Sequence, residues 1–178
     1  MISIKNGIYI PIIYFISLYL FNNDYLLSTS LSLRFFTINY FFWFQKWTIE
    51  GQMKQFVRFT DSQTILCLLN KIFYKNKIIK EITFYIFTLI TFGFWIFKFF
   101  NIDETTKKTK YPFLQSDINN FYHYINHGLL YLLFNIKYFN DIKFTINGFK
   151  YTLIYILFYI MIIYIPWYFI TDDRIYDI

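Results

Sequence analysis

Two histidines, His123 and His127, stand four residues apart inside a mostly apolar stretch of the chain, and the sequence contains no others. Neutral imidazole is the usual general base near neutral pH. Residues four apart share one face of a helix, so a metal site would need a third ligand from elsewhere. The other apolar stretches contain one acidic residue, Glu50, which lies near the end of its stretch. Because no suitable third ligand is present, we expect no metal and no cofactor.

Thr37 carries the hydroxyl that could act with His127. A threonine is a poor nucleophile unless a neighbouring base takes its proton. If its helix begins near Ser32, Thr37 lies about 8 Å from the membrane surface, and His127 lies about 9 Å from the same surface. The two side chains would then meet if their helices touch. In the alternative interpretation, Thr37 bonds to its own helix backbone and His127 bonds to another span.

The apolar stretches predict the elements that would hold these side chains. The 178 residues are 57% hydrophobic and 16% charged, against about 25% charged in soluble domains. A membrane helix needs about 20 mostly apolar residues, whose backbone groups must pair within their own segment. We therefore predict an all-α, polytopic transmembrane helix bundle, forming a single domain over residues 1–178. Its spans, about five, cover residues 6–23, 32–53, 82–101, 118–137 and 151–171.

The second predicted span is the least regular, because Lys46 and Glu50 lie in its last third and Lys54 follows it directly. These three share one helical face and could pair, with Lys46 extending to the far interface. An interfacial half-helix is the alternative. The equal depth expected for Thr37 and His127 favours the full span.

The charge pattern predicts how such a bundle is oriented. Eleven of the 17 Lys and Arg fall on one side if five spans alternate, including a basic segment at 55–80. The positive-inside rule then predicts that the N-terminus and this segment are cytosolic and that the C-terminus is outside. The net charge of +6 indicates contact with anionic lipid. Nucleic acid is not an expected partner, because the basic residues flank spans and form no basic domain.

Four strings carry a resemblance to a known family. RFFTINYFFWFQ resembles the second-span motif of the androgen-induced membrane protein family, and ITFGFWIFKFFNIDETTKKTKYP resembles its third span and following loop. INHGLLYLLFNI is similar to the Asn-His-Gly that opens the fourth span, and YIPWYFITDDRIYDI is similar to the pattern near the fifth. Their order and spacing match the family over about residues 30–178.

The resemblance implies an intramembrane hydrolase with a threonine nucleophile and a histidine base, acting on fatty acid esters of hydroxy fatty acids. Thr37 and His127 stand in the matching motifs, so the resemblance assigns them these catalytic roles. Asn126 or Asn39 could donate to the oxyanion, and Gly128 could allow close helix approach. The expected partners are membrane lipids and a lipid ester substrate, in the endoplasmic reticulum, the plasma membrane or an organellar membrane.

The chain departs from the family in several respects. The family has six spans and five are predicted here, the aromatic-Pro pair usual in the third span is absent, and the second histidine often found after Asn-His-Gly is missing. A catalytically inactive structural or accessory membrane protein, for example in an organellar complex, is the alternative function. A transporter or channel is a third class, although no paired broken spans or internal repeat support transport. The single cysteine, Cys67, excludes an internal disulfide and is predicted to be a core or lipid contact.

Overall fold

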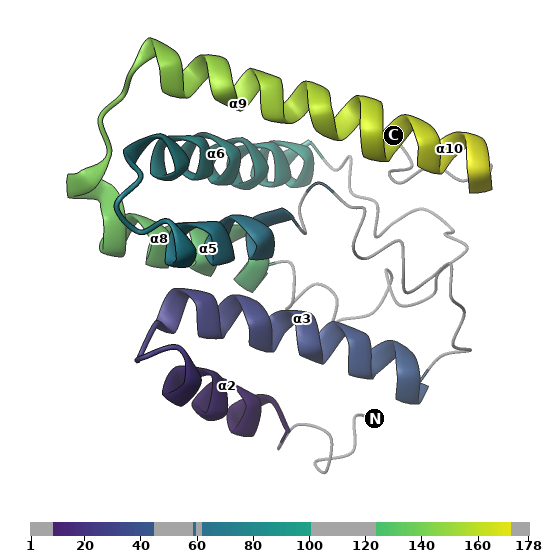
Figure 1. The fold of residues 1–178 in the computed structure, drawn as a ribbon. Helices are drawn as coiled ribbons and strands as arrows, with labels where there is room; N and C mark the ends of the chain where they lie inside the picture. Colours follow the sequence, from purple (N-terminus) through teal and green to yellow (C-terminus); the bar gives the residue numbers. More distant parts are fainter. Residues whose placement is uncertain (1–8, 45–58, 60–61, 101–123, 172–178) are drawn as a thin grey trace.

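The computed structural model describes residues 9–44, 59, 62–100 and 124–171, with side chains at 11–35, 59, 62–100 and 124–170. All regular structure in these ranges is helical (Figure 1), which confirms the predicted all-α class. The helices lie side by side: α3 packs against α2, α5 and α8, and α6 packs against α5, α8 and α9.

Helices α2 (Tyr9–Leu20) and α3 (Tyr25–Phe44) form a hairpin. Its turn uses Asn22 and Asn23 at φ 53° and 58°, a left-handed conformation that asparagine tolerates well. The carboxylate of Asp24 then accepts the Leu27 N–H at 3.2 Å, as a helix N-cap does. Helix α3 therefore begins at Tyr25 and not near Ser32, where the second span was predicted to begin.

Serine and threonine hydroxyls allow this early start. Ser32 donates to the Ser28 carbonyl and Thr29 donates to the Tyr25 carbonyl, each at 2.7 Å. Hydroxyls that bond back to the preceding turn satisfy themselves inside a helix. The serine-rich stretch is therefore helical, although its composition is typical of a loop.

Helices α5 (Ser62–Ile72) and α6 (Lys77–Phe99) form a second hairpin, and the Asn76 side chain caps α6 by accepting the N–H groups of Ile78 and Ile79. All of α5 lies inside the predicted basic segment 55–80. Helix α5 is not confined to the surface, because one of its faces packs against α3 and α6 and buries Cys67. The prediction that Cys67 is a core contact is confirmed.

The C-terminal half begins with a widened turn η4 (Ile125–Leu129), which leads into α8 (Leu130–Tyr138) and η5 (Phe139–Asp141). Helix α9 (Ile146–Tyr159), a second widened turn η6 (Ile160–Tyr164) and α10 (Ile165–Thr171) then follow one another without interruption. Pro166 explains the widening at η6, because proline has no N–H and its ring clashes with the preceding turn.

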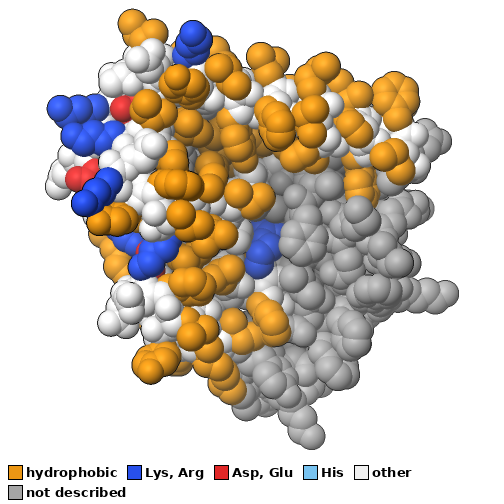
Figure 2. Space-filling view, in the orientation of Figure 1, with side chains coloured by type: hydrophobic (Ala, Val, Ile, Leu, Met, Phe, Trp, Pro, Cys, Tyr) orange, Lys and Arg blue, Asp and Glu red, His pale blue; other side chains and the backbone are white. Residues whose placement is uncertain are grey.

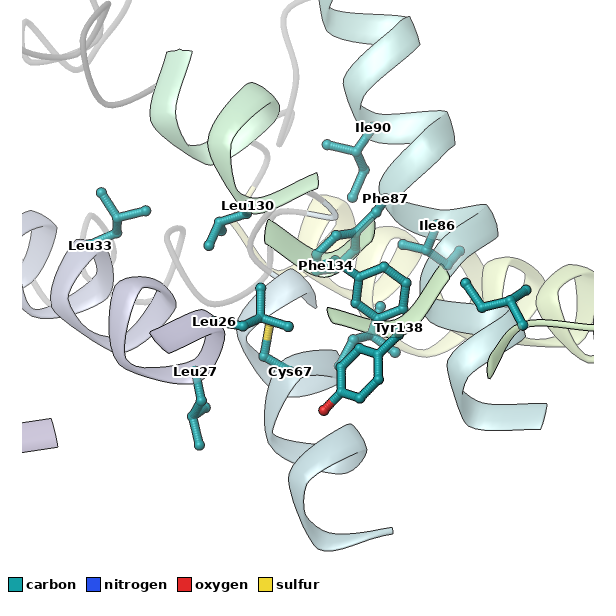
Figure 3. Packing of buried hydrophobic residues seen from close by; sticks show 12 residues of the cluster. Leu26, Leu27, Leu33, Cys67, Ile86, Phe87, Ile90, Leu130, Phe134 and Tyr138 are labelled. Carbon is teal, nitrogen blue, oxygen red and sulfur yellow. The ribbon is translucent and has the colours of Figure 1, made fainter. Parts of the chain in front are cut away.

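The apolar core lies between α3, α5, α6 and α8 (Figure 3). Phe87, Phe134 and Tyr138 lie in a row there, with ring centroids 5.2 Å apart in each adjacent pair. Leu26 and Cys67 pack beside them. The aromatic row therefore joins α6 to α8, and the leucines of α3 close its other side.

Ion pairs bring three chain connections to one end of the bundle, which we call the charged end. Asp24, in the first hairpin turn, lies 2.6 Å from the Lys137 ammonium and 3.7 Å from that of Lys71. Lys80 lies 2.6 Å from Asp141, and this hydrogen bond lowers the pKa of the Asp141 carboxyl. The α2–α3 turn, the α5–α6 turn and the α8–α9 connection thus share this end (Figure 1).

The charged end corrects the predicted alternation of sides. Five alternating spans would put residue 24 on the opposite side from residues 71–80, whereas Lys71 donates to the Phe21 carbonyl at 2.8 Å. The reason is the position of the turn, because α3 begins directly after Asp24. The first two helices therefore meet at the same end as the α5–α6 turn.

Two described helices are long and apolar enough to cross a membrane, α6 at Lys77–Phe99 and the continuous helix Ile146–Ile170. Length and composition alone are weak evidence, because a core helix of a soluble protein can have both. However, only 28% of the most apolar part of α6 and 11% of that of the helix Ile146–Ile170 are buried inside the molecule. Apolar side chains cover much of the face in Figure 2, and exposed apolar surface of this extent is typical of contact with lipid or a partner.

Candidate functional site

Asn126 and His127 lie in η4, where the backbone widens. The N–H of Leu130 bonds to the Ile125 carbonyl, five residues back. Such single widened turns occur frequently at functional sites. Unlike η6, this turn has no proline next to it, so proline geometry does not explain it.

Both side chains are buried, with 1% of Asn126 and 2% of His127 exposed. The imidazole of His127 stacks on the ring of Phe94 in α6, with centroids 4.3 Å apart and planes 18° apart. A near-parallel stack fixes the plane of the imidazole. It therefore restricts the directions in which the two ring nitrogens can point.

Aromatic rings and one ammonium surround the Phe94 side of the site. The Lys98 ammonium lies 4.4 Å from the Tyr124 ring centroid and 5.8 Å from that of Phe94, within the range of cation–π attraction. Trp95 packs on Tyr124 at 5.6 Å. Residues 94–98 of α6 thus hold the beginning of the η4–α8 segment.

Thr37 lies in α3, but its side chain is outside the described residues, so its meeting with His127 stays a prediction; the side chain of Asn39 and all of His123 are also outside them. The Asp24–Lys137 pair fixes the register of α3 against α8. Thr37 stands 13 residues after Asp24, and His127 stands 10 residues before Lys137. At 1.5 Å per residue, the two backbones are about 20 Å and 15 Å from the charged end, an offset of about one turn.

Arg34 is a buried residue that the sequence interpretation treated as a span-flanking charge. It is the residue of α3 level with His127 in this register, and only 7% of it is exposed. If α3 crosses a membrane, Arg34 is an ionisable side chain at membrane depth, which is costly and usually functional. The sequence feature that could have indicated its burial is that Arg34 is the single charged residue between Asp24 and Lys46.

Further buried polar side chains lie at comparable depth. We define the polar layer as Arg34, Gln63, Thr91, Asn126 and His127, all of which are buried. Counted along their helices from Asp24, Lys71, Lys80 and Lys137, they lie about 12–17 Å from the charged end. This is roughly half the 30 Å of a bilayer core.

Other candidates carry less chemistry. Burial raises the pKa of the Cys67 thiol to about 12, which makes it a poor nucleophile. Among the described residues, no three His, Cys, Asp or Glu side chains are grouped so that they could hold a metal. A Cβ added at Gly128 would have no described atom within 4 Å, so the suggested close helix approach at this glycine gains no support.

Comparison of this chain with protein-family models, curated proteins and solved structures finds no match.

Proposed function

We propose that this chain is a multi-pass membrane hydrolase, which cleaves lipid esters with Thr37 as nucleophile and His127 as base. The single observation that carries the proposal is the buried imidazole of His127 in a turn that no proline widens. A base held inside an apolar bundle suits an ester whose chains are dissolved in lipid. Fatty acid esters of hydroxy fatty acids are the proposed substrates.

The proposed reaction passes through an acyl-enzyme. His127 takes the hydroxyl proton of Thr37, and the Thr37 oxygen attacks the ester carbonyl carbon. The hydroxy fatty acid leaves with that proton. Water, deprotonated by His127, then attacks the acyl-threonine, and the free fatty acid departs as Thr37 regains its proton.

Asn126 is the proposed donor to the oxyanion. Its side-chain nitrogen is buried and has no acceptor among the described residues. Buried amide donors nearly always have a partner, so a donor left open beside a base suits a group that is present only during reaction. Oxyanion donors of this kind contribute about 10²–10³-fold to turnover.

Fatty acid release from a defined ester by the purified, reconstituted protein tests the proposal. We expect Thr37→Ala and His127→Ala each to lower turnover by about 10²–10⁴-fold, and Thr37→Ser to keep measurable activity. Thr29→Ala is the matched control, because the Thr29 hydroxyl bonds to its own helix at the Tyr25 carbonyl. His123→Ala controls for loss of a histidine.

A structural or accessory role is the second candidate. The stack of His127 on Phe94 favours this role, because a histidine that merely joins α6 to η4 would also be buried and packed against a ring. In that case folded wild-type protein would release no fatty acid. His127→Ala would then lower thermal stability, and Thr37→Ala would have no effect.

A further inference from the structure

Four lysines at the charged end lie outside its ion pairs, although Lys77 is close enough to Asp141 to help lower the pKa of that carboxyl. Lys75, Lys77, Lys143 and Lys150 are exposed, and none makes an ion pair with a described residue. The other lysines at this end, Lys71, Lys80 and Lys137, are paired with Asp24 or Asp141. We call the four unpaired lysines the basic rim.

The basic rim lies at the start of both helices that could cross a membrane. Lys75 and Lys77 immediately precede or open α6, and Lys143 precedes α9. Lys150 stands about one turn into α9, where a long side chain can extend to the interface. All four ammonium groups therefore belong at the level of lipid headgroups if these helices span.

Exposed apolar side chains accompany the basic rim. Phe73 and Tyr74 are exposed in the α5–α6 turn, and Phe144 and Ile146 are exposed beside Lys143. Figure 2 shows Lys and Arg gathered on the edge of the molecule where these connections lie, next to continuous apolar surface. Aromatic residues beside lysines are typical of a membrane–water interface. A soluble acidic partner would leave these apolar side chains in water.

We propose that the basic rim binds the headgroups of anionic phospholipids in the leaflet at the charged end. Two chain connections and the first turn of α9 supply the lysines, so the lipids would join the α5–α6 turn to the α8–α9 connection. Charge complementarity determines the choice of lipid, because a neutral headgroup offers these ammonium groups no net charge. The proposal does not depend on hydrolase activity.

Native mass spectrometry of the detergent-solubilised protein tests this binding, with phosphatidylserine and phosphatidylcholine of the same acyl chains as probes. We expect the wild type to retain phosphatidylserine preferentially, and salt to weaken this retention. Each lysine should contribute up to about fivefold in affinity. The triple variant K75Q/K77Q/K143Q should therefore bind phosphatidylserine about 10–100-fold more weakly.

The matched control is K107Q/K108Q/K110Q, which removes the same charge from a segment predicted on the opposite side and should bind as the wild type does. Equal retention of the two lipids by the wild type would overturn the proposal. An equal loss in the two triple variants would also overturn it, because net charge and not this surface would then determine binding.

Discussion

Glu81 is a buried carboxylate that attaches one helix to the beginning of another. It accepts the Thr145 hydroxyl at 2.7 Å and the Thr145 N–H at 3.2 Å, while the Thr145 hydroxyl accepts the Gly148 N–H at 3.0 Å. Thr145 is the N-cap of α9, so a side chain of α6 completes the cap of α9. This cross-helix cap positions the long helix that runs to Thr171.

Gly148 permits this contact, because a Cβ there would overlap the Glu81 carboxylate and lie 2.9 Å from the Glu81 Cβ. We expect Gly148→Ala to destabilise the fold by about 2 kcal/mol, as overpacking typically does. Gly128→Ala is the matched control and should have little effect. Thermal unfolding in detergent measures both, and equal midpoints for the two variants would contradict the close approach at Gly148.

Individual residues also show the limits of prediction from sequence. The burial of Cys67 was predictable, because it stands on the apolar side of an amphipathic stretch. Gly148 was not singled out, because its constraint comes from Glu81, 67 positions earlier. Arg34 was assigned to a span end, since nothing local reveals that α3 begins nine residues before it.

At the scale of elements, Asp24 joins three helices. Its carboxylate is 4% exposed and contacts Lys137 of α8 and Lys71 of α5, and it also caps α3. A buried charge that loses its partners is strongly destabilising, although these lysines are partly exposed and therefore partly screened.

We expect Asp24→Asn to lower the free energy of unfolding by about 2 kcal/mol. Lys137→Met should cost less, because Lys71 remains beside Asp24. A double-mutant cycle should then give a favourable coupling between the two positions. Unfolding with a denaturing detergent measures the four proteins, and zero coupling would show that the pair does not fix the register of α3 against α8.

The elements were predictable in type but not in all their boundaries. Apolar stretches predicted helices where α2, α6, α8 and α9 lie, because length and hydropathy are local properties. The start of α3 depended on hydroxyls bonding to the preceding turn, and the packing of α5 depended on tertiary contacts. The widening at η4 has no signal that we could identify in the sequence.

At the scale of the whole molecule, the structure changes the expected path of the chain. Because Asp24, Lys71 and Lys137 meet at one end, the first hairpin turn and the α5–α6 turn lie on one side. If these helices cross a membrane, the positive-inside rule predicts that this side is cytosolic. The predicted alternation of spans is wrong here. It assumed a single crossing between residue 24 and residues 71–80, whereas α3 leads away from the charged end and α5 leads back to it.

Cysteine labelling in sealed membranes tests this path. The native Cys67 is buried and should not react with an impermeant maleimide. We expect Asn23→Cys and Lys75→Cys, both at exposed positions, to be labelled from the same side. Labelling from opposite sides would contradict the shared end and restore the original alternation.

The central claim is that Thr37 and His127 act together as nucleophile and base. The most direct measurement is the site of covalent modification by a lipid-like fluorophosphonate, located by mass spectrometry in the folded protein. We predict a single adduct on Thr37, which is lost in His127→Ala and kept in His123→Ala. An adduct on another residue, or no adduct on folded wild-type protein, would contradict the account.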